Sequence, residues 1–147
     1  MVTVEPISKV NVNDVVLLAE MLWPDTEISG LEAHYSELLG SAQGACFVLR
    51  EGESHIAFIE VSLRSDFVEG SSGSPVPFIE GIFVSPAYRR NGLGRLLMQK
   101  AEEWALAKGF KEICSDTELG NQSSVRFHLA AGFSETSRNI YFVKHLG

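Results

Sequence analysis

The most constraining feature of this chain is a β-prone segment followed by a basic, glycine-containing loop and a long helix. Residues 77–84 read PFIEGIFV, residues 89–94 read RRNGLG, and an apolar stripe at helical spacing continues to Lys108. Such a loop aims the free backbone N–H groups of the next helix at one point, where the helix dipole adds positive potential. The pattern predicts an anion-binding loop, and a solvated turn that only caps the helix is the alternative.

The loop matches neither of two familiar nucleotide motifs. No Gly-Lys-Ser/Thr follows it, which excludes a Walker loop, and the Gly-x-Gly-x-x-Gly dinucleotide fingerprint is missing. Gly92 and Gly94 are expected to let the backbone approach a bound group closely. The other residues predicted to contact the anion are Arg89, Arg90, Asn91, Leu93 and Arg95.

The whole chain, residues 1–147, is interpreted as one mixed α/β domain. Gly81 interrupts a β-prone segment, which suggests a bulge or a close approach at that position. Helices are predicted from Asn11 or Asn13 to Leu22, at 30–39, from the loop to Lys108, and at 121–131. Strands are predicted at 2–8, 45–50, 55–64, 77–84, 111–115, 133–135 and 139–145.

Charge and composition narrow the range of partners. The net charge is −7, so the broad basic surface that nucleic acid requires is not expected. Residues 1–40 hold seven acidic residues and one basic residue, whereas residues 85–111 hold six basic and two acidic ones. This asymmetry favours two ligands of opposite sign.

Other sequence signals point to a cytoplasmic protein. No apolar run is long enough for a membrane span, and no signal peptide is evident. Cys46 and Cys114 lie in apolar segments without metal-ligand spacing, so neither a disulfide scaffold nor a metal site is expected.

Two motifs together resemble the GNAT N-acetyltransferase superfamily. Arg89, Gly92 and Gly94 match its Arg/Gln-x-x-Gly-x-Gly/Ala acetyl-CoA motif, and residues 121–133 are similar to its N-x-x-A-x-x-[LF]-Y-x-x-x-G-F helix. The resemblance implies a GNAT fold, with a mixed central sheet, splayed parallel strands and flanking helices. It also implies acetyl-CoA as co-substrate and direct transfer of the acetyl group to an amine in a ternary complex.

A narrower resemblance, spread along the whole chain, is to the aminoglycoside 6'-N-acetyltransferases of resistant bacteria. It implies acetylation of the cationic 6'-amino group of the antibiotic, and hence resistance. Three positions depart from that family, which often has Tyr at Phe67, His at Thr26 and an acid at Ser137. The motifs that carry the resemblance are Leu22-Trp23-Pro24, Asp66-Phe67-Val68, Phe78–Val84, Ser115-Asp116-Thr117, Gly132-Phe133 and Glu135-Thr136.

Two other functions remain open at this point. The same chemistry would serve a polyamine, another amino sugar or a protein amine as acceptor. A protein of another class, a catalytically silent acetyl-CoA-binding module, would bind the cofactor without turnover.

Three residues are predicted to carry the chemistry. Glu80 lies in an apolar strand, where a carboxylate must be paired, and is interpreted as general base and ammonium anchor or as the partner of Arg64 in an ion pair. Asp116, at the end of the neighbouring strand, is predicted to bind the ammonium or share the base role, with a turn cap as the alternative. His128 stands where many relatives have a Tyr general acid, so it is expected to protonate the leaving thiolate unless it is only packed.

The resemblance also implies binding roles for neighbouring residues. The backbone of Ile82, Phe83 and Val84 would bind the pantetheine arm, and an N–H near Val84 would polarise the thioester oxygen. Asn121 is predicted to hydrogen-bond the pantetheine, to cap its helix, or to do both.

Acceptor binding and assembly complete the predicted functions. Trp23 is predicted to form a wall for a sugar ring or to pack in the core, and Glu135 to contact the substrate. Relatives commonly dimerise through their C-terminal strands, so residues 139–145 are expected to take part in a homodimer.

Overall fold

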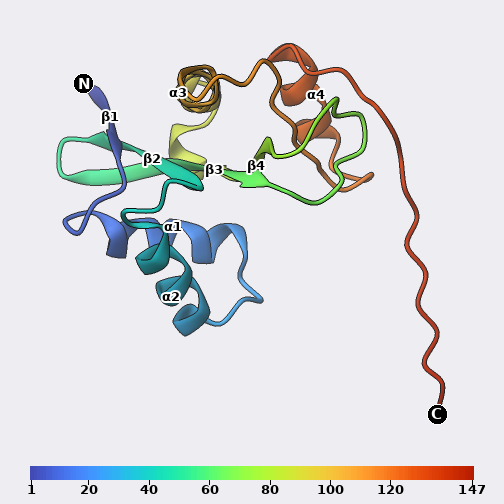
Figure 1. The fold of residues 1–147 in the computed structure, drawn as a ribbon. Helices are drawn as coiled ribbons and strands as arrows, with labels where there is room; N and C mark the ends of the chain where they lie inside the picture. Colours follow the sequence, from blue (N-terminus) through green and yellow to red (C-terminus); the bar gives the residue numbers. More distant parts are fainter.

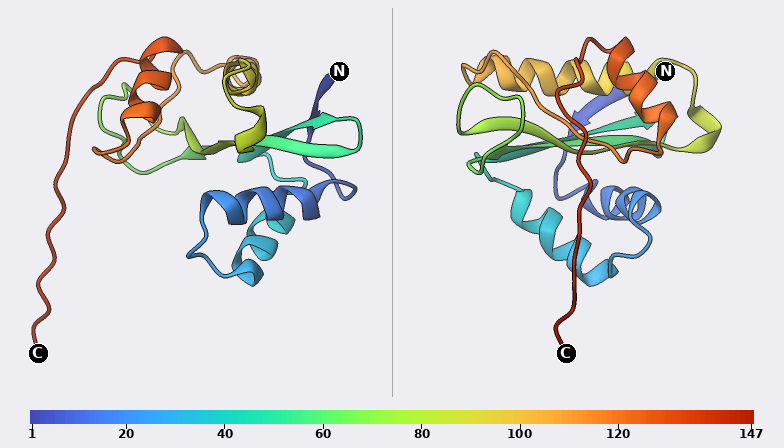
Figure 2. Two further views of the ribbon diagram at one scale, coloured as in Figure 1. Left: turned by 180° about the vertical axis from the view of Figure 1, so that it is seen from behind. Right: turned by 90° about the vertical axis from the view of Figure 1, so that its right-hand side faces the viewer.

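A computed structural model describes all of residues 1–147 and contains a four-stranded antiparallel sheet as its central layer (Figure 1). The strands lie in the order β1-β2-β3-β4, with α1 and α2 on one face and α3 on the other, where α4 lies beyond β4 (Figures 1 and 2). The elements are β1 (Val2–Pro6), α1 (Val12–Leu22), α2 (Ile28–Leu38), β2 (Gly44–Glu51), β3 (Ser54–Arg64), β4 (Val76–Val84), the short 3₁₀ helix η1 (Pro86–Tyr88), α3 (Leu93–Ala107) and α4 (Gln122–Ala130).

Each face of the sheet has its own hydrophobic core, because successive side chains of a strand point to opposite faces. Phe58 of β3 packs with Val15 of α1 and Tyr35 of α2, whereas the next residue, Ile59, packs with Leu97 of α3. No helix combines the length and the apolar character that a membrane span needs.

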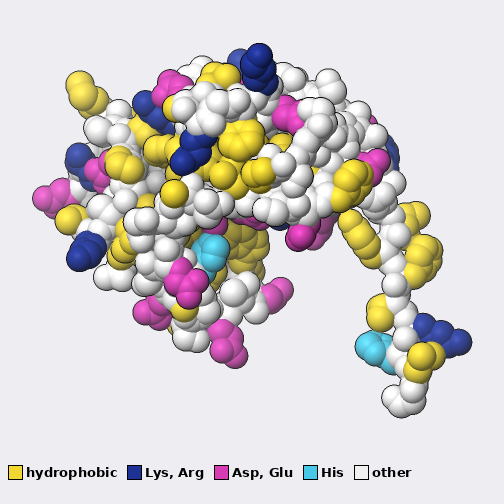
Figure 3. Space-filling view, in the orientation of Figure 1, with side chains coloured by type: hydrophobic (Ala, Val, Ile, Leu, Met, Phe, Trp, Pro, Cys, Tyr) yellow, Lys and Arg dark blue, Asp and Glu magenta, His cyan; other side chains and the backbone are white.

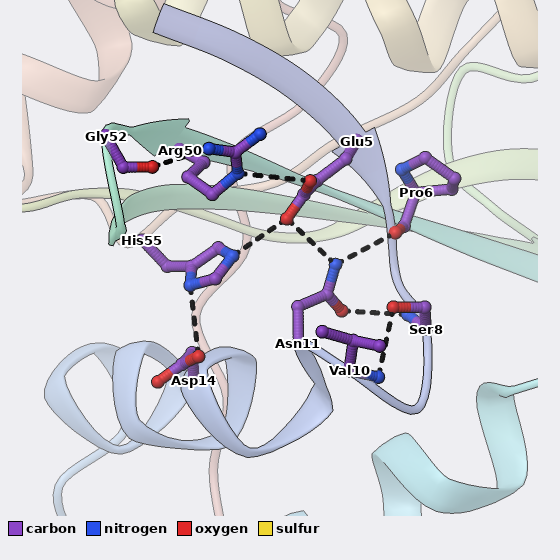
Figure 4. Close-up of polar contacts among 9 residues, drawn as sticks. All are labelled: Glu5, Pro6, Ser8, Val10, Asn11, Asp14, Arg50, Gly52 and His55. Carbon is purple, nitrogen blue, oxygen red and sulfur yellow. Dashed lines mark hydrogen bonds and ion pairs between the residues drawn. The ribbon is translucent and has the colours of Figure 1, made fainter.

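A polar cluster ties β1 and α1 to the start of β3 (Figure 4). The two ring nitrogens of His55 lie 2.8 Å from Glu5 Oε1 and 3.0 Å from Asp14 Oδ2. The buried side chain of Asn11 donates to Glu5 as well, and Arg50 lies 3.4 Å from its other oxygen. The hydrogen bond from His55 is the main reason that the pKa of Glu5 lies below its ordinary value. The cluster therefore joins four elements, β1, α1, β2 and β3, by charge-assisted contacts.

The predicted interruption of the fourth strand is confirmed as a bulge. Glu60 lies opposite Gly81 and Val61 opposite Ile79, so Glu80 is an extra residue in β4. A Cβ on Gly81 would lie 2.5 Å from the Trp23 ring, which therefore packs directly on the backbone of the bulge. Both features predicted at Gly81, a bulge and a close approach of another group to the backbone, are therefore confirmed.

The structure corrects the predicted end of the sheet. The strand expected at 111–115 is reduced to one parallel bridge between Phe78 and Cys114, and the splayed parallel pair stays a prediction. The strands expected at 133–135 and 139–145 are wrong for this structure, because no strand follows β4. Strands need a neighbour for their backbone groups, and the C-terminal tail beyond Thr136 runs away from the body (Figure 2).

Candidate active site

The loop between β4 and α3 presents unpaired backbone donors. Gly92, the residue that precedes α3, has a left-handed conformation with φ 75°, and so has Arg90 with φ 67°. No side chain caps α3, and its first internal hydrogen bond runs from the Leu96 N–H to the Gly92 carbonyl. The amides of the first helical turn are therefore free to bind an anion, as predicted for this loop.

The three arginines of this region differ in what their guanidinium groups contact. Arg89 donates from Nε to the Val84 carbonyl at 2.8 Å, and Arg95 donates to the Ala130 carbonyl at the end of α4. Both side chains thereby join the loop to neighbouring elements. Arg90 is exposed and makes no hydrogen bond or ion pair within the chain, so all of its N–H donors are free for a ligand, while the charges of Arg89 and Arg95 are not neutralised by an acid either.

Asn91 and Gly94 also have structural roles. The Asn91 amide donates to the Tyr88 carbonyl at 3.3 Å, which stabilises the turn. A Cβ on Gly94 would lie 3.0 Å from the Phe127 ring, so this glycine allows α4 to pack closely on α3. The sequence had suggested only a close approach to a ligand at this position.

Residues 82–84 of β4 have one open edge. Ile82, Phe83 and Val84 pair with β3 on one side. On the other side, β4 bonds the Cys114 backbone only through Pro77 and Ile79, at 2.9 Å and 2.8 Å. The backbone beyond the bulge is therefore available to an extended ligand.

Glu80 forms an ion pair with Arg64, which was the alternative role predicted for this residue. Arg64 donates to its two oxygens at 2.6 Å and 2.9 Å, and the Ser62 hydroxyl donates to it as well. Burial by itself would raise the pKa of Glu80, but the bonds from Arg64 and Ser62 outweigh it and hold the pKa below its ordinary value. Its role as a base stays a prediction.

Two further carboxylates lie near the same guanidinium. The pKa of Arg64 is raised first by its hydrogen bond to Glu80, and the charges of Asp116 and Asp66 raise it further. Glu80 of β4 is thus bonded to this arginine, and the charges of Asp116 and Asp66 act on it without a hydrogen bond or ion pair. The pairing of Glu80 with Asp116 in one site stays a prediction.

Another carboxylate, Glu60, lies at the bulge, and it was not predicted from the sequence. Glu60 is buried, with only 2% of its surface exposed. Tyr35 donates its hydroxyl to Oε1 at 2.8 Å, and His34 Nε2 donates to Oε2 at 2.6 Å. The available signal was an acid in the apolar run HIAFIEVSL.

His128 lies between two serines of the site. Its Nδ1 is 2.7 Å from the Ser124 carbonyl, and its Nε2 is 2.8 Å from the Ser115 hydroxyl. Because a carbonyl only accepts, Nδ1 carries the proton, and Ser115 donates to Nε2. Ser115 precedes Asp116 in the chain and was named from the sequence only as part of the Ser115-Asp116-Thr117 motif, without a role.

The remaining predicted residues divide between packing and surface positions. Trp23 packs edge-on against Phe58 at 6.3 Å, which confirms its core role. Asn121 caps α4 by accepting from the Ser124 N–H at 3.1 Å, so the predicted cap is confirmed. Glu135 is exposed and bonds Arg138, away from the Arg64 group. Nowhere do three His, Cys, Asp or Glu side chains converge in a way that could hold a metal ion.

The fold, the open helix terminus and the open edge of β4 are those of a class of acyl-group transferases. The chain belongs to the acetyltransferase (GNAT) family, whose sequence profile matches residues 15–133. This confirms the predicted family and the GNAT fold.

Individual relatives are similar over nearly the whole length. The chain is 40% identical to an aminoglycoside N(6')-acetyltransferase type 1 of Acinetobacter genomosp. 13, with 97% of each chain covered. It is 38% identical to the protein of the same name from Serratia marcescens, over 93% of this chain and 94% of the relative. The structure of AAC(6')-Iy in complex with a CoA-S-monomethyl-acetylneamine bisubstrate analog superimposes with a TM-score of 0.93, at 33% identity and 99% coverage of both chains.

Proposed function

We propose that this protein transfers acetyl from acetyl-CoA to the 6'-amino group of aminoglycosides and thereby confers resistance. The observation that carries the proposal is the presence of two sites of opposite sign on β4 and the loop that follows it. Free amides and Arg90 suit an anionic cofactor, and three carboxylates around Arg64 suit a cationic acceptor. The similarity to relatives named for this activity supports the same conclusion.

The cofactor half of the site follows from the loop. The pyrophosphate of acetyl-CoA would bind the first turn of α3, and the pantetheine would lie along the open edge of β4. AAC(6')-Iy, which shares this fold, has been solved with CoA. The residues proposed to bind the cofactor are Ile82, Phe83, Val84, Arg89, Arg90, Asn91, Gly92, Leu93, Gly94, Arg95 and Asn121, with Arg89 and Arg95 supporting the loop.

The acceptor half is acidic. Glu80 and Asp116 are proposed to anchor the substrate ammonium groups, and Trp23 to support a sugar ring from the surface of the bulge. Glu135 is the proposed outer contact. An acceptor with several positive charges is favoured over an acidic peptide, because the first 40 residues are also strongly acidic.

The chemistry is proposed as direct attack of the amine on the thioester. The C–N bond forms, the C–S bond breaks, and the thiolate of CoA leaves with a proton. His128 is the proposed proton donor in its doubly protonated form, in which Nε2 also carries a proton and gives it to the thiolate directly or through the Ser115 hydroxyl. Burial raises the pKa of both cysteine thiols, which disfavours an acyl-cysteine intermediate.

We also propose that the C-terminal tail joins two copies of the chain. Residues 140–143 are 73–91% exposed and form an apolar segment that stands clear of the body (Figure 3). Beside Ile113 and Cys114 lies a groove of about 490 Å³, lined also by α3, residues 131–134 and Thr136. A β-prone tail of a second copy would suit such an open edge. Deletion of residues 139–147 should then give a monomer by light scattering; an unchanged mass would contradict the proposal.

The expected compartment is the cytoplasm, where the ribosome that aminoglycosides attack and the acetyl-CoA pool are found. Nucleic acid is not an expected ligand of this acidic protein. The predicted aminoglycoside product has lost one positive charge, which weakens its binding to ribosomal RNA.

The decisive assay follows CoA release with four classes of acceptor. Turnover with kanamycin-type 6'-amino compounds, and none with 6'-hydroxy aminoglycosides, would support the proposal. Turnover only with spermidine or a peptide would show that the acceptor is a polyamine or a protein amine and not an aminoglycoside. Tight binding of acetyl-CoA without any turnover would favour the silent binding module.

A further inference from the structure

The acetylation of an ammonium group releases one net proton. The acceptor enters as R–NH₃⁺, since alkyl amines such as lysine titrate near pH ~10.4, and the products are a neutral amide and CoA thiol. One proton therefore has to leave the ammonium before the nitrogen can attack and must finally reach solvent. Some group close to the acceptor has to take it up.

Glu80 is poorly suited to this task in the present structure. Both of its oxygens accept hydrogen bonds from Arg64, and Ser62 adds a third. These bonds hold the pKa of Glu80 below its ordinary value despite partial burial, so its carboxylate is a weak proton acceptor. It is a better anchor for an ammonium than a base.

A histidine lies on the same face of the sheet. His34 of α2 reaches the buried Glu60, whose position opposite Gly81 places it at the bulge that contains Glu80. Glu80 bonds Ser62, which lies two residues beyond Glu60 along β3, so Glu60 and Glu80 both face the side of the sheet that α2 covers. Trp23, the proposed sugar wall, packs on the same Gly81.

The geometry around His34 fixes its tautomer. Glu60 is a carboxylate that accepts a bond from Tyr35 and can only accept at its other oxygen, 2.6 Å from His34 Nε2. Burial and the Glu60 charge raise the Tyr35 pKa, so that hydroxyl stays a donor. Nε2 of a neutral His34 therefore carries the proton. Nδ1 keeps its lone pair and makes no hydrogen bond within the chain.

The exposure of the pair suits a proton carrier. The Glu60 side chain is only 3% exposed, whereas that of His34 is 52% exposed. An inner carboxylate that orients an outer imidazole is the arrangement by which enzymes fix and strengthen a histidine base. A proton taken at Nδ1 can pass to bulk water directly from the exposed ring.

We propose that His34, oriented by Glu60, accepts the proton of the acceptor ammonium at Nδ1, directly or through one water, and releases it to solvent. In this step an N–H bond of the ammonium breaks, and an N–H bond forms on the imidazole. The free amine then attacks the thioester. The inference rests on the proposed amine acetylation but not on which amine is used. The other titratable groups near the pair keep their protonation state: Tyr35 stays a neutral donor, Cys46, which lies opposite Glu60 in the sheet, a neutral thiol, and Glu80 an anion.

The test is the pH profile of kcat/KM for wild type, His34→Gln and Glu60→Gln. A protonated ring cannot accept a proton, so wild-type activity should fall on the acid side. His34→Gln should lose roughly 100-fold in activity and also lose that acid limb. Glu60→Gln keeps the shape but not the charge, so its acid limb should move to lower pH. Glu37→Gln, an exposed change on the same helix, should match wild type.

Chemical rescue separates chemistry from folding. His34→Ala should fold, because the position is half-exposed and alanine favours a helix. Added imidazole should restore part of its activity. Unchanged pH profiles in the variants, or lower activity without a change in profile and without rescue, would overturn the proposal. If wild type prefers another amine, the same series with that amine gives the answer, so the acceptor proposal and this one fail separately.

Discussion

Substitution of Gly81 by alanine tests whether the bulge positions Trp23. The new Cβ would lie 2.5 Å and 2.7 Å from two ring atoms of Trp23, whereas ordinary contacts begin at 3.4 Å. The ring must therefore retreat by about 0.9 Å, the difference between 3.4 Å and 2.5 Å. Phe58 lies behind the ring at 6.3 Å, edge-on, so there is little room for that movement.

The expected cost is that of overpacking a filled site, about 1–3 kcal/mol. For a chain of this size it corresponds to a fall in Tm of roughly 2–12 °C. Because Gly81 has no positive φ, backbone strain does not contribute. The displaced ring should also raise KM for the aminoglycoside several-fold and leave KM for acetyl-CoA unchanged.

A double-mutant cycle with Trp23→Leu makes this prediction specific. Without the ring, Gly81→Ala should cost much less, because the only tight contact that remains is with Leu22 Cδ2 at 3.1 Å. Gly30→Ala, at a helical glycine with open space around it, is the matched control and should stabilise. Equal Tm values for Gly81→Ala and wild type, or the same cost in the Trp23→Leu background, would refute the reasoning.

Three further predictions follow from the loop, the acidic site and the polar cluster. Gly92→Val should raise KM for acetyl-CoA at least about tenfold by obstructing the anion site, whereas Gly109→Val, which has a similar backbone strain at φ 90°, should leave KM unchanged. Asp116→Asn should raise KM for the aminoglycoside and not that for acetyl-CoA, and equal changes would indicate a structural role. The pKa of Glu5 is lowered by folding, so its contribution to stability is present above the unfolded value near 4.5 and is lost as the pH falls through the folded value. Glu5→Gln should therefore destabilise the protein in urea at pH ~7, and the loss should shrink progressively as the pH falls below 4.5; a loss that does not change with pH would argue against the ion pairs.

Local signals were sufficient for the part of the site that lies on one continuous segment. The β-prone run, the glycine loop and the helical stripe predicted β4, the anion loop and α3, because each depends on neighbours a few residues away. Gly81 predicted the bulge, and Asn121 predicted the cap of α4, for the same reason. Features that depend on the stereochemistry of a few neighbouring residues can be predicted from the local sequence.

Contacts between distant segments were less predictable. His34 and Glu60 are 26 residues apart in the chain, and nothing local in either segment shows that they meet. The arginines of the loop were visible as charge, but not the carbonyl groups to which Arg89 and Arg95 donate. The strand predicted at residues 139–145 was wrong for a related reason. An apolar, β-prone segment forms a strand only where the open edge of another strand is close enough to pair with it.

The bulge explains why one strand can serve both the core and the site. Before it, Ile79 packs on the α3 side; after it, Ile82 packs on that side and Phe83 on the side of α1 and α2. In a regular strand, residues 79 and 82 would face opposite sides of the sheet, so one of the two isoleucines would no longer pack against α3. The extra residue of the bulge, Glu80, brings both isoleucines onto the α3 side. Its own side chain bonds polar partners and does not pack in a hydrophobic core. The residue proposed to anchor the substrate is thus placed by the same irregularity that lets both halves of β4 bury their apolar side chains.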